Sequence, residues 1–290
     1  MANSLVWSKY DYVQKMRDRI NAPTTWKDVL NVKISDSYSI ISGYHTKATE
    51  PAGASLTRGT AYTYEDITTA ADTLTISSSW KVAMLVDEAD RYQQTYMTQM
   101  SIADYQAKKL NEKIESLALI AAAAGTNFGA GDLANSSTDD STAITISASN
   151  IDDVIRAVKR KIYKNNGVEF AVEKGIFFVW RPEDFELLEA FVQANGFTEA
   201  DIALKNGIPV QKAFHYMGVD HYLSTSNYTG HVFAGIKGMM EIGLLRGTYG
   251  SVKFIEDPGL VSGLGIVSRI DYGFNLPAYN IQFIVDVNVS

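Results

Sequence analysis

The chain of 290 residues contains no cysteine. This absence excludes disulfide bonds, thiolate nucleophiles and zinc sites built on sulfur ligands. Proline is scarce, with six residues, and neither proline nor glycine occurs between Thr60 and Ala124. Because these two residues most often interrupt helices and strands, this stretch can form long, unbroken elements.

Long apolar runs and an excess of basic residues are also missing. The longest apolar run, Leu117–Ala124, is far shorter than the ~20 residues of a membrane-spanning helix. Residues 1–20 are charged along their length and do not resemble a signal peptide. The net charge of −7 argues against a protein that wraps nucleic acid by neutralising phosphates. We therefore expect a soluble intracellular protein with no membrane partner, and only non-specific contact with nucleic acid.

Catalytic motifs are absent as well. The sequence has no G-x-x-x-x-G-K-[ST] phosphate loop, no G-x-G-x-x-G after a strand and no G-x-S-x-G nucleophile turn. Acidic pairs occur at Asp139–Asp140, Asp152–Asp153 and Glu183–Asp184, each at or just before a predicted helix start. Carboxylates there are stabilised by the helix dipole, so we interpret them as capping groups. We predict no catalytic residue, no cofactor and no enzyme activity.

The best candidate for a metal site is His215 and His221 with Asp220. Their six-residue spacing matches neither the i, i+4 histidine pair of helical metalloproteases nor a zinc-finger interval. In a β region the two histidines would share a face only if a strand ran unbroken through Gly218. We interpret them as surface or packing residues and predict no metal ligand. An intracellular metal-binding enzyme that uses His215 and His221 is one alternative.

Strong periodicity marks the stretch without glycine and proline. Alternate residues from Leu74 to Val86 are apolar, which predicts a half-buried strand. The apolar spacing then changes to three or four, which predicts a one-sided helix over Glu88–Ala124, roughly 55 Å long. The predicted helix stripe contains Tyr92, Tyr96, Met100, Ala103, Ala107, Leu110, Ile114, Leu117 and Ala121. Such elements expose surfaces that suit neighbouring copies of the chain.

Two further features precede this strand. An aromatic arm, with Trp7 and Tyr10 on its apolar face, predicts a short helix that ends near Asn21 and lies on another surface. A strand over residues 32–40 is expected to pair with the strand over 74–86. The intervening Ser42–Asp72 is rich in Gly, Ala, Ser and Thr, and connections of this length are usually functional. We interpret it as a long hairpin that projects from the body and lies across a neighbouring subunit.

The second half of the chain predicts a compact α/β subdomain. After a turn-rich junction come a helix to about Lys164, with a capping box at Ser149 and Asp152, and a buried strand over Ile176–Trp180. Pro182 opens another helix, which ends at Asn195. From residue 210 onward the pattern is mostly β. The predicted closing strand alternates Ile281, Phe283, Val285, Val287 and Val289 with polar residues.

This order of parts resembles the major capsid proteins of tailed phages, which have the Hong Kong 97 type fold. Nearly the whole chain takes part in the resemblance. The stretches that resemble the family locally are ADTLTISSSWKVAMLVDEADRYQ (71–93), FFVWRPEDFELLEAF (177–191), GHVFAGIKGMMEIGLLRGTYGSVKFIEDPG (230–259) and RIDYGFNLPAYNIQFI (269–284).

The resemblance implies an α+β fold with five parts. They are an N-terminal arm (1–30), an extended β-hairpin loop (31–86), a peripheral subdomain with a long spine helix (87–148), an axial α/β subdomain (149–235) and a return to the peripheral subdomain (236–290).

The resemblance also implies a function. The chain would assemble with itself, as hexamers and pentamers, into the icosahedral shell of a tailed double-stranded DNA phage, and be located in the virion capsid after assembly in the host cytoplasm. Its implied partners are a separate scaffolding protein, a portal, and the decoration proteins that some members carry. A second alternative is an encapsulin, a nanocompartment shell protein of the same fold.

Overall fold

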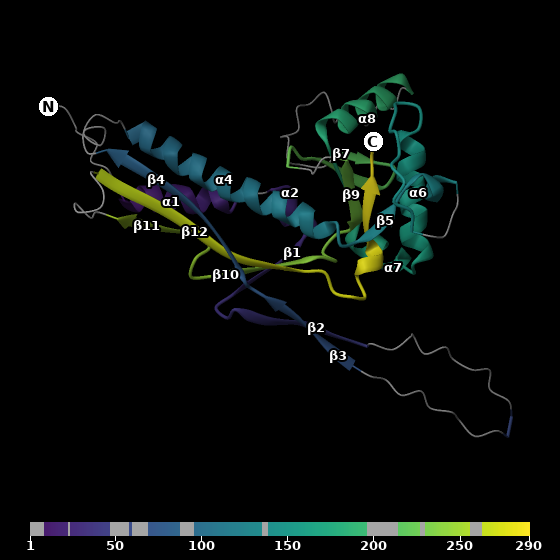
Figure 1. Cartoon of the computed structure of the whole chain (residues 1–290), viewed down its shortest axis with the longest axis horizontal. Helices are drawn as coiled ribbons and strands as arrows, with labels where there is room; N and C mark the ends of the chain where they lie inside the picture. Colours follow the sequence, from purple (N-terminus) through teal and green to yellow (C-terminus); the bar gives the residue numbers. More distant parts are fainter. Residues whose placement is uncertain are drawn as a thin grey trace.

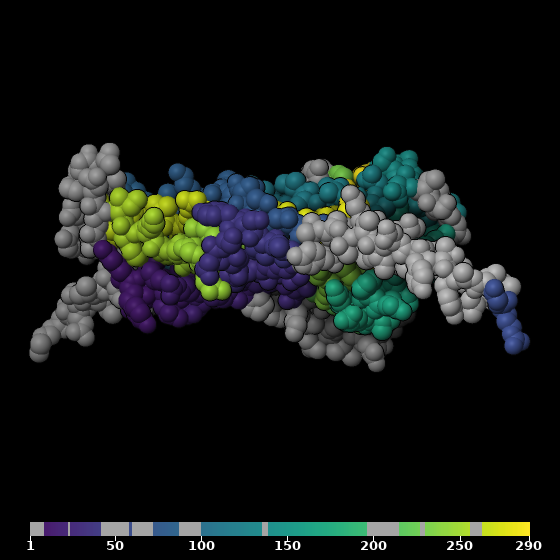
Figure 2. All heavy atoms as spheres, turned by 90° about the horizontal axis from the view of Figure 1, so that it is seen from below, coloured from purple at the N-terminus to yellow at the C-terminus, as the bar shows by residue number. Residues whose placement is uncertain are grey.

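The chain forms two packed lobes and a hairpin that extends away from them, in a computed structural model (Figure 1). The structure describes residues 9–22, 24–46, 58–59, 69–87, 96–134, 139–195, 214–226, 230–255 and 263–290. Within these residues the strands form sheets of five, six and two strands. The five-stranded sheet belongs to the first lobe, and the six-stranded sheet belongs to the second. Figure 2 shows the elongated outline from the side on which the hairpin extends.

The first sheet combines strands from distant parts of the sequence. Its strands are β1 (Asn31–Ser35), β10 (Glu241–Leu245), β12 (Gly263–Asn275) and β11 (Ser251–Ile255), with β4 (Ser78–Asp87) paired to β12. Along β12, Leu264, Ile266 and Ile270 are buried, whereas Arg269 is exposed. Up to Ile270 the alternation shows that one face of this sheet is in the core and the other is open, whereas Asp271, Tyr272 and Gly273 are all buried.

Helix α4 (Tyr96–Ala122) runs along the covered face of the first sheet and reaches the second lobe (Figure 1). Its 27 residues make a rod of about 40 Å. The predicted stripe is buried at Ala103, Ala107, Leu110 and Ile114. The long helix is therefore confirmed from Tyr96 onward, and residues 88–95 of the prediction lie outside the described residues.

The N-terminal arm packs on α4 of the same chain through α1 (Lys9–Ile20) and is followed by α2 (Thr25–Val29). The predicted helix is confirmed, and the predicted apolar face, which also contained Val13, Met16, Arg17 and Ile20, is right at Met16 and Ile20 and wrong at Tyr10, which is 77% exposed. Tyr12, Met16 and Ile20 form the buried face, at the four-residue spacing of one helix side. The hydroxyl of Tyr12 donates to Oε1 of Gln106 at 2.8 Å, which fixes the arm on α4.

The hairpin consists of β2 (Ser39–Thr46) and β3 (Thr69–Thr75), which pair antiparallel. The predicted pairing of two long strands is only partly right. Bends at residues 36–38 separate β2 from β1, and residues 76–77 separate β3 from β4, so that each predicted strand becomes two. In both cases one half joins the first sheet and the other half joins the hairpin. Residues 47–57 and 60–68 of the predicted loop lie outside the described residues.

The second lobe contains a six-stranded sheet with helices packed around it (Figure 1). In sheet order the strands are β5 (Thr126–Phe128), β13 (Ile284–Asn288), β9 (His231–Ile236), β6 (Ile176–Trp180), β8 (Val219–Leu223) and β7 (Phe214–Tyr216). The helices are α5 (Ala130–Leu133), α6 (Ile151–Lys164), α7 (Val168–Lys174) and α8 (Pro182–Ala194).

Most predictions for this lobe are confirmed. Strand β6 is buried along its whole length, and Pro182 opens α8 as its first residue. The predicted capping box at Ser149 and Asp152 is wrong. Asn150 is the residue that precedes α6, and its side-chain Oδ1 accepts from the N–H of Ser147 at 2.8 Å.

The C-terminal segment differs from the sequence prediction. Residues Ile281–Phe283 form a 3-10 turn, and β13 begins at Ile284, with Ile284 through Val287 all buried. Alternation does not describe this strand, because β13 lies inside a sheet whose two faces are both covered, with helices packed around it. Within the predicted parts 236–290 and 87–148, β13 and β5 both belong to the second sheet, and the five-part division stays a prediction.

Candidate functional site

The strand pair that carries His215 and His221 turns sharply between them. Met217 and Gly218 both have positive φ, 54° and 73°, as a tight hairpin turn requires. His215 lies opposite Asp220, and His221 lies opposite Phe214. Because neighbouring residues on a strand point to opposite faces, the two histidines lie on opposite sides of the hairpin. The chain therefore does not bring them together as a metal-binding pair.

His215 is exposed and belongs to a small charged cluster. Its Nδ1 lies 2.8 Å from Oδ1 of Asp220, and Lys237 donates to the other oxygen of that carboxylate. Burial alone would raise the pKa of Asp220, but the hydrogen bonds from Lys237 and His215 outweigh it and hold the pKa below its usual value. This cluster fastens β7 to the sheet and leaves Asp220 with both oxygens in use.

His221 is buried and uses both of its ring nitrogens. Nε1 of Trp180 donates to Nδ1 at 2.9 Å, so the imidazole proton lies on Nε2, which donates to the carbonyl of Tyr216 at 3.2 Å. The ring also stacks near Trp180. Burial lowers the pKa of His221 to about 4, and the side chain is neutral at pH 7. With no free lone pair, His221 acts as a core residue.

The acidic pairs take part in local structure. Asp152 and Asp153 lie in the first turn of α6, and Glu183 and Asp184 lie in the first turn of α8, as predicted. Asp140 differs, because it accepts from the N–H of Gly131 at 2.6 Å, next to the short helix α5. Among the described residues, no three His, Asp or Glu side chains gather in a way that could hold a metal ion.

A buried acid, Asp286, was not singled out from the sequence. Its Oδ1 lies 2.8 Å from Nδ1 of His231, across the β9–β13 pair. Burial raises the pKa of Asp286, and the contact with His231 partly opposes this rise. The pair ties the closing strand to the middle of the second sheet. Its sequence signal is weak because the two residues are 55 positions apart.

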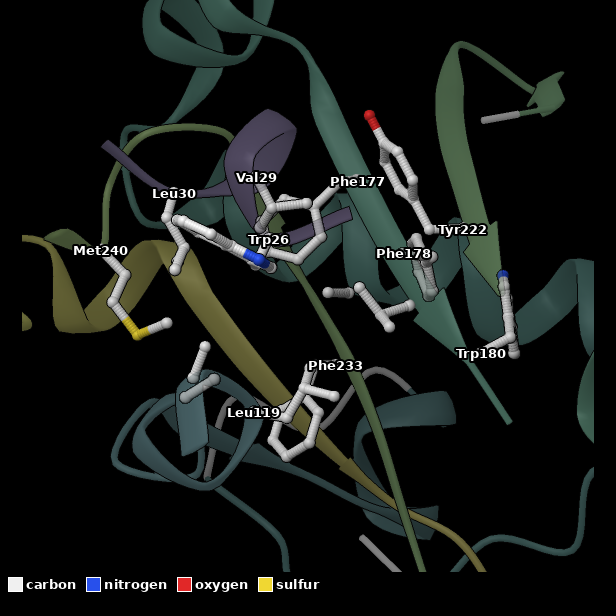
Figure 3. Packing of buried hydrophobic residues seen from close by; sticks show 14 of the residues in the cluster. Trp26, Val29, Leu30, Leu119, Phe177, Phe178, Trp180, Tyr222, Phe233 and Met240 are labelled. Atoms are coloured by element: carbon white, nitrogen blue, oxygen red, sulfur yellow. The ribbon is translucent and has the colours of Figure 1, made fainter. Parts of the chain in front are cut away.

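The joint between the lobes is closely packed. Trp26 and Leu30 of the arm meet Leu119 of α4 and Phe177 and Phe233 of the second sheet (Figure 3). The cavity among them has a volume of about 30 Å³, close to the share of one water molecule in the liquid. An apolar space of this size does not hold an organic ligand, so the joint is structural.

Part of the outer face of the first sheet is exposed among the described residues. Register places Leu85, Gly265 and Ile255 in one row across β4, β12 and β11. Leu85 is 59% exposed and Ile255 is 42% exposed, so this row presents two aliphatic side chains to solvent. On the hairpin, which belongs to a separate sheet, Ile41 is 58% exposed. In the described part of the chain, no helix has the length and apolar character to cross a bilayer.

Comparisons with known proteins show the fold. No protein-family model and no curated protein sequence matches the chain. It is similar to a solved structure from Mycobacterium phage Che8, with a TM-score of 0.65, 15% identity and 91% of each chain covered. It is similar to the capsid structure of cyanophage P-SCSP1u, with a TM-score of 0.60, 14% identity and coverage of 92% of this chain and 88% of the other.

A third similar structure is a virus-like particle from Pyrococcus furiosus, with a TM-score of 0.59 and 12% identity. It covers 97% of this chain and 100% of the other. These likenesses extend over both lobes, and they confirm the prediction from the sequence: the chain has the α+β fold of phage capsid shells.

Proposed function

We propose that the chain is the major capsid protein of a tailed double-stranded DNA phage and assembles into its icosahedral shell. The observation that carries this proposal is capsid-type architecture over 91% of the chain. The hairpin supports it, because β2 and β3 extend away from both lobes (Figure 1). An extended hairpin with exposed apolar groups gains its contacts from a neighbouring subunit. The role is structural, and it needs no catalytic residue or cofactor.

Each part of the fold corresponds, in this proposal, to a part of a capsid subunit. In this proposal the first lobe, with α4 as the spine helix, is the peripheral subdomain, and the second lobe is the axial subdomain. The β2–β3 hairpin is the extended loop, and the arm begins the chain. Subunits form hexamers and pentamers through interfaces that relate one copy to the next by rotation.

The proposed partners follow from a shell that fills with DNA. A separate scaffolding protein guides assembly in the host cytoplasm, a portal occupies one vertex, and decoration proteins bind from outside in some shells of this kind. The net charge of −7 argues against tight binding to the packaged DNA, because binding through phosphates needs a basic surface, so the proposed contact with DNA is non-specific and weak.

A nanocompartment shell of the encapsulin type is the second candidate. The similarity to a virus-like particle from Pyrococcus furiosus is the observation behind it, but the similar phage capsid structures favour the phage shell. The two candidates differ in what the shell encloses, because a phage shell takes up DNA and an encapsulin takes up a cargo enzyme. Nuclease-resistant DNA in particles from the native source supports the phage shell, whereas a stoichiometric co-purified enzyme supports the encapsulin.

Expression of the chain with and without a scaffolding protein tests the proposal. We expect rings, shells or tubes of tens of copies or more, detected by sedimentation and electron microscopy. Monomers or dimers alone, over a wide range of protein and salt concentration and with scaffold present, would contradict it.

A further inference from the structure

Two glycines lie directly opposite each other where the hairpin meets the first sheet. Gly243 of β10 pairs with Gly273 of β12. A Cβ placed on Gly273 would lie 2.0 Å from the carbonyl oxygen of Thr75 and 3.1 Å from Cα of Ile76. A contact of 2.0 Å is far shorter than real Cβ atoms make. The backbone at the end of β3 therefore crosses the sheet at a point that glycine alone leaves open.

Gly243 makes room for side chains at the same crossing. Its Cβ would lie 2.9 Å from Cδ2 of Leu74 and 3.2 Å from Cγ1 of Ile76. Leu74 and Ile76 are fully and almost fully buried, although Thr73 and Thr75 between and beside them are exposed. Two buried side chains and a backbone carbonyl thus rest on the glycine pair. We call Gly243, Gly273, Leu74 and Ile76 the hairpin seat.

We propose that the hairpin seat fixes the direction in which the hairpin projects, and that assembly depends on this direction. The inference rests on the proposed capsid function. Among the described strands, β2 and β3 pair only with each other, so their hydrogen bonds do not hold them to either lobe. The N–H of Ile76 donates to the carbonyl of Tyr38 at 2.8 Å, which joins both legs of the hairpin at the seat. Gly243 and Gly273 are positioning residues for the contact between subunits.

Leverage makes the seat sensitive to small changes. The eight residues of β2 span about 26 Å, whereas the base from Leu74 to Ile76 spans about 7 Å. A methyl group on Gly273 would have to move Thr75 by about 1 Å, which becomes about 4 Å at the far end of β2. Heterologous interfaces close into rings only at the correct rotation between copies. A tilted hairpin therefore prevents closure even when the subunit is folded.

The first test compares two glycines of the first lobe in the full chain. Gly273→Ala introduces the clash, whereas a Cβ on Gly247 has no heavy atom within 4 Å, so Gly247→Ala is the control. We expect Gly273→Ala to form closed shells at no more than a tenth of the unmodified yield, and Gly247→Ala to assemble normally. Electron microscopy and sedimentation measure the yield. Normal shells from Gly273→Ala would overturn the inference.

Amide hydrogen exchange on the unassembled subunit gives a readout that does not need assembly. Gly273→Ala should speed exchange at Ile76 at least tenfold, because lifting Thr75 breaks the bond from Ile76 to Tyr38, while Gly247→Ala leaves it unchanged. If the unmodified chain forms no shells, the proposed function fails, and the exchange rates still decide whether the seat holds the hairpin. Equal exchange in the two variants would overturn the seat itself.

If Gly273→Ala does not fold, a pair of substitutions that compensate for each other tests the hairpin seat instead. Gly243→Ala crowds Leu74, and Leu74→Ala removes the Cγ and Cδ atoms that are crowded. The double variant should therefore assemble better than either single variant, which independent effects on stability do not predict. A double variant that is as defective as the sum of the two changes would contradict a shared role for these residues.

Discussion

The two lobes differ in how completely they cover their own strands. In the second lobe β6 is buried at every residue, and β9 is buried at all but its first. In the first lobe β10 is also buried at every residue, but β4 from Lys81 to Val86 and β11 from Val252 to Ile255 alternate exposed residues with less exposed ones. Strands covered on both faces form a finished core, whereas a sheet with one open face can receive another protein. The comparison predicts that the second lobe buries its own strands without a partner, and that the exposed face of the first lobe takes part in contacts between subunits together with the hairpin.

The side chains of the second lobe's core also differ in kind from those on the open face of the first lobe. In the second lobe His221 and Asp184 are buried with hydrogen-bond partners, Trp180 and Arg181 among them. The open face of the first lobe instead presents aliphatic groups such as Leu85 and Ile255 to solvent. Changes in the second lobe should therefore alter stability, and changes on the open face should alter assembly.

The largest expected effect is in the core of the second lobe. Trp180→Ala removes a fully buried indole and leaves Nδ1 of His221 without its donor. We expect the free energy of unfolding to fall by about 4 kcal/mol. Urea denaturation of the unassembled subunit measures it. Val172→Ala, in the same lobe but at a side chain that is 84% exposed, is the matched control and should cost less than about 0.5 kcal/mol.

A smaller effect is expected from acid. The folded pKa of His221, about 4, lies below its ordinary value of 6.5, so folding favours the neutral ring. This contribution to stability is present above pH 6.5 and is lost as the pH falls from 6.5 to 4, by up to about 3 kcal/mol. His221→Gln can accept from Trp180 and donate to Tyr216 but cannot titrate. Its unfolding free energy should fall less between pH 7 and pH 4 than that of the unmodified chain, and equal slopes would contradict the buried neutral state.

Much of the contrast between buried and half-exposed elements could be predicted from the sequence, because the spacing of apolar residues along one helix or strand is a local signal. The stripe of α4, the buried strand β6 and the helix that begins at Pro182 were predicted from spacing alone. Breaks in long strands were not, because the bends at residues 36–38 and 76–77 are set by which sheet each half joins. Likewise β13 has two buried faces because other elements pack on both sides of the second sheet at this interior strand. Pairings between distant segments leave little trace in one sequence.

The relative placement of His215 and His221 also could not be predicted from the sequence. Their spacing left open whether they share a face, and the turn at Met217–Gly218 decided it. The hairpin seat is a tertiary feature as well. A glycine in a strand indicates close approach of another backbone, but the sequence does not say which segment approaches Gly273.

A smaller effect on stability is expected where the N-terminal arm packs on α4. Tyr12→Phe removes the hydroxyl that donates to Gln106, while Ser268 still donates to the same oxygen. We expect a loss of about 1 kcal/mol in the free energy of unfolding. Tyr10→Phe, on the exposed side of the same helix, should have no measurable effect. Equal effects of the two changes would show that the arm is not held by this bond.

The smallest expected effect on stability is on the open face, where the effect on assembly should be clear. Leu85→Ser changes a side chain that is 59% exposed, so the free energy of unfolding should change by no more than about 0.5 kcal/mol. Lys81→Ser is the matched control, because Lys81 lies on the same face of the same strand, opposite Arg269 rather than in the aliphatic row. If a second copy covers that row, each subunit interface loses the burial of one leucine. The protein concentration needed for shell formation, measured by light scattering, should then rise severalfold for Leu85→Ser and stay within twofold for Lys81→Ser. Equal thresholds for both variants would show that the open face is not an assembly surface, and the contacts between subunits would have to lie on the hairpin and the second lobe.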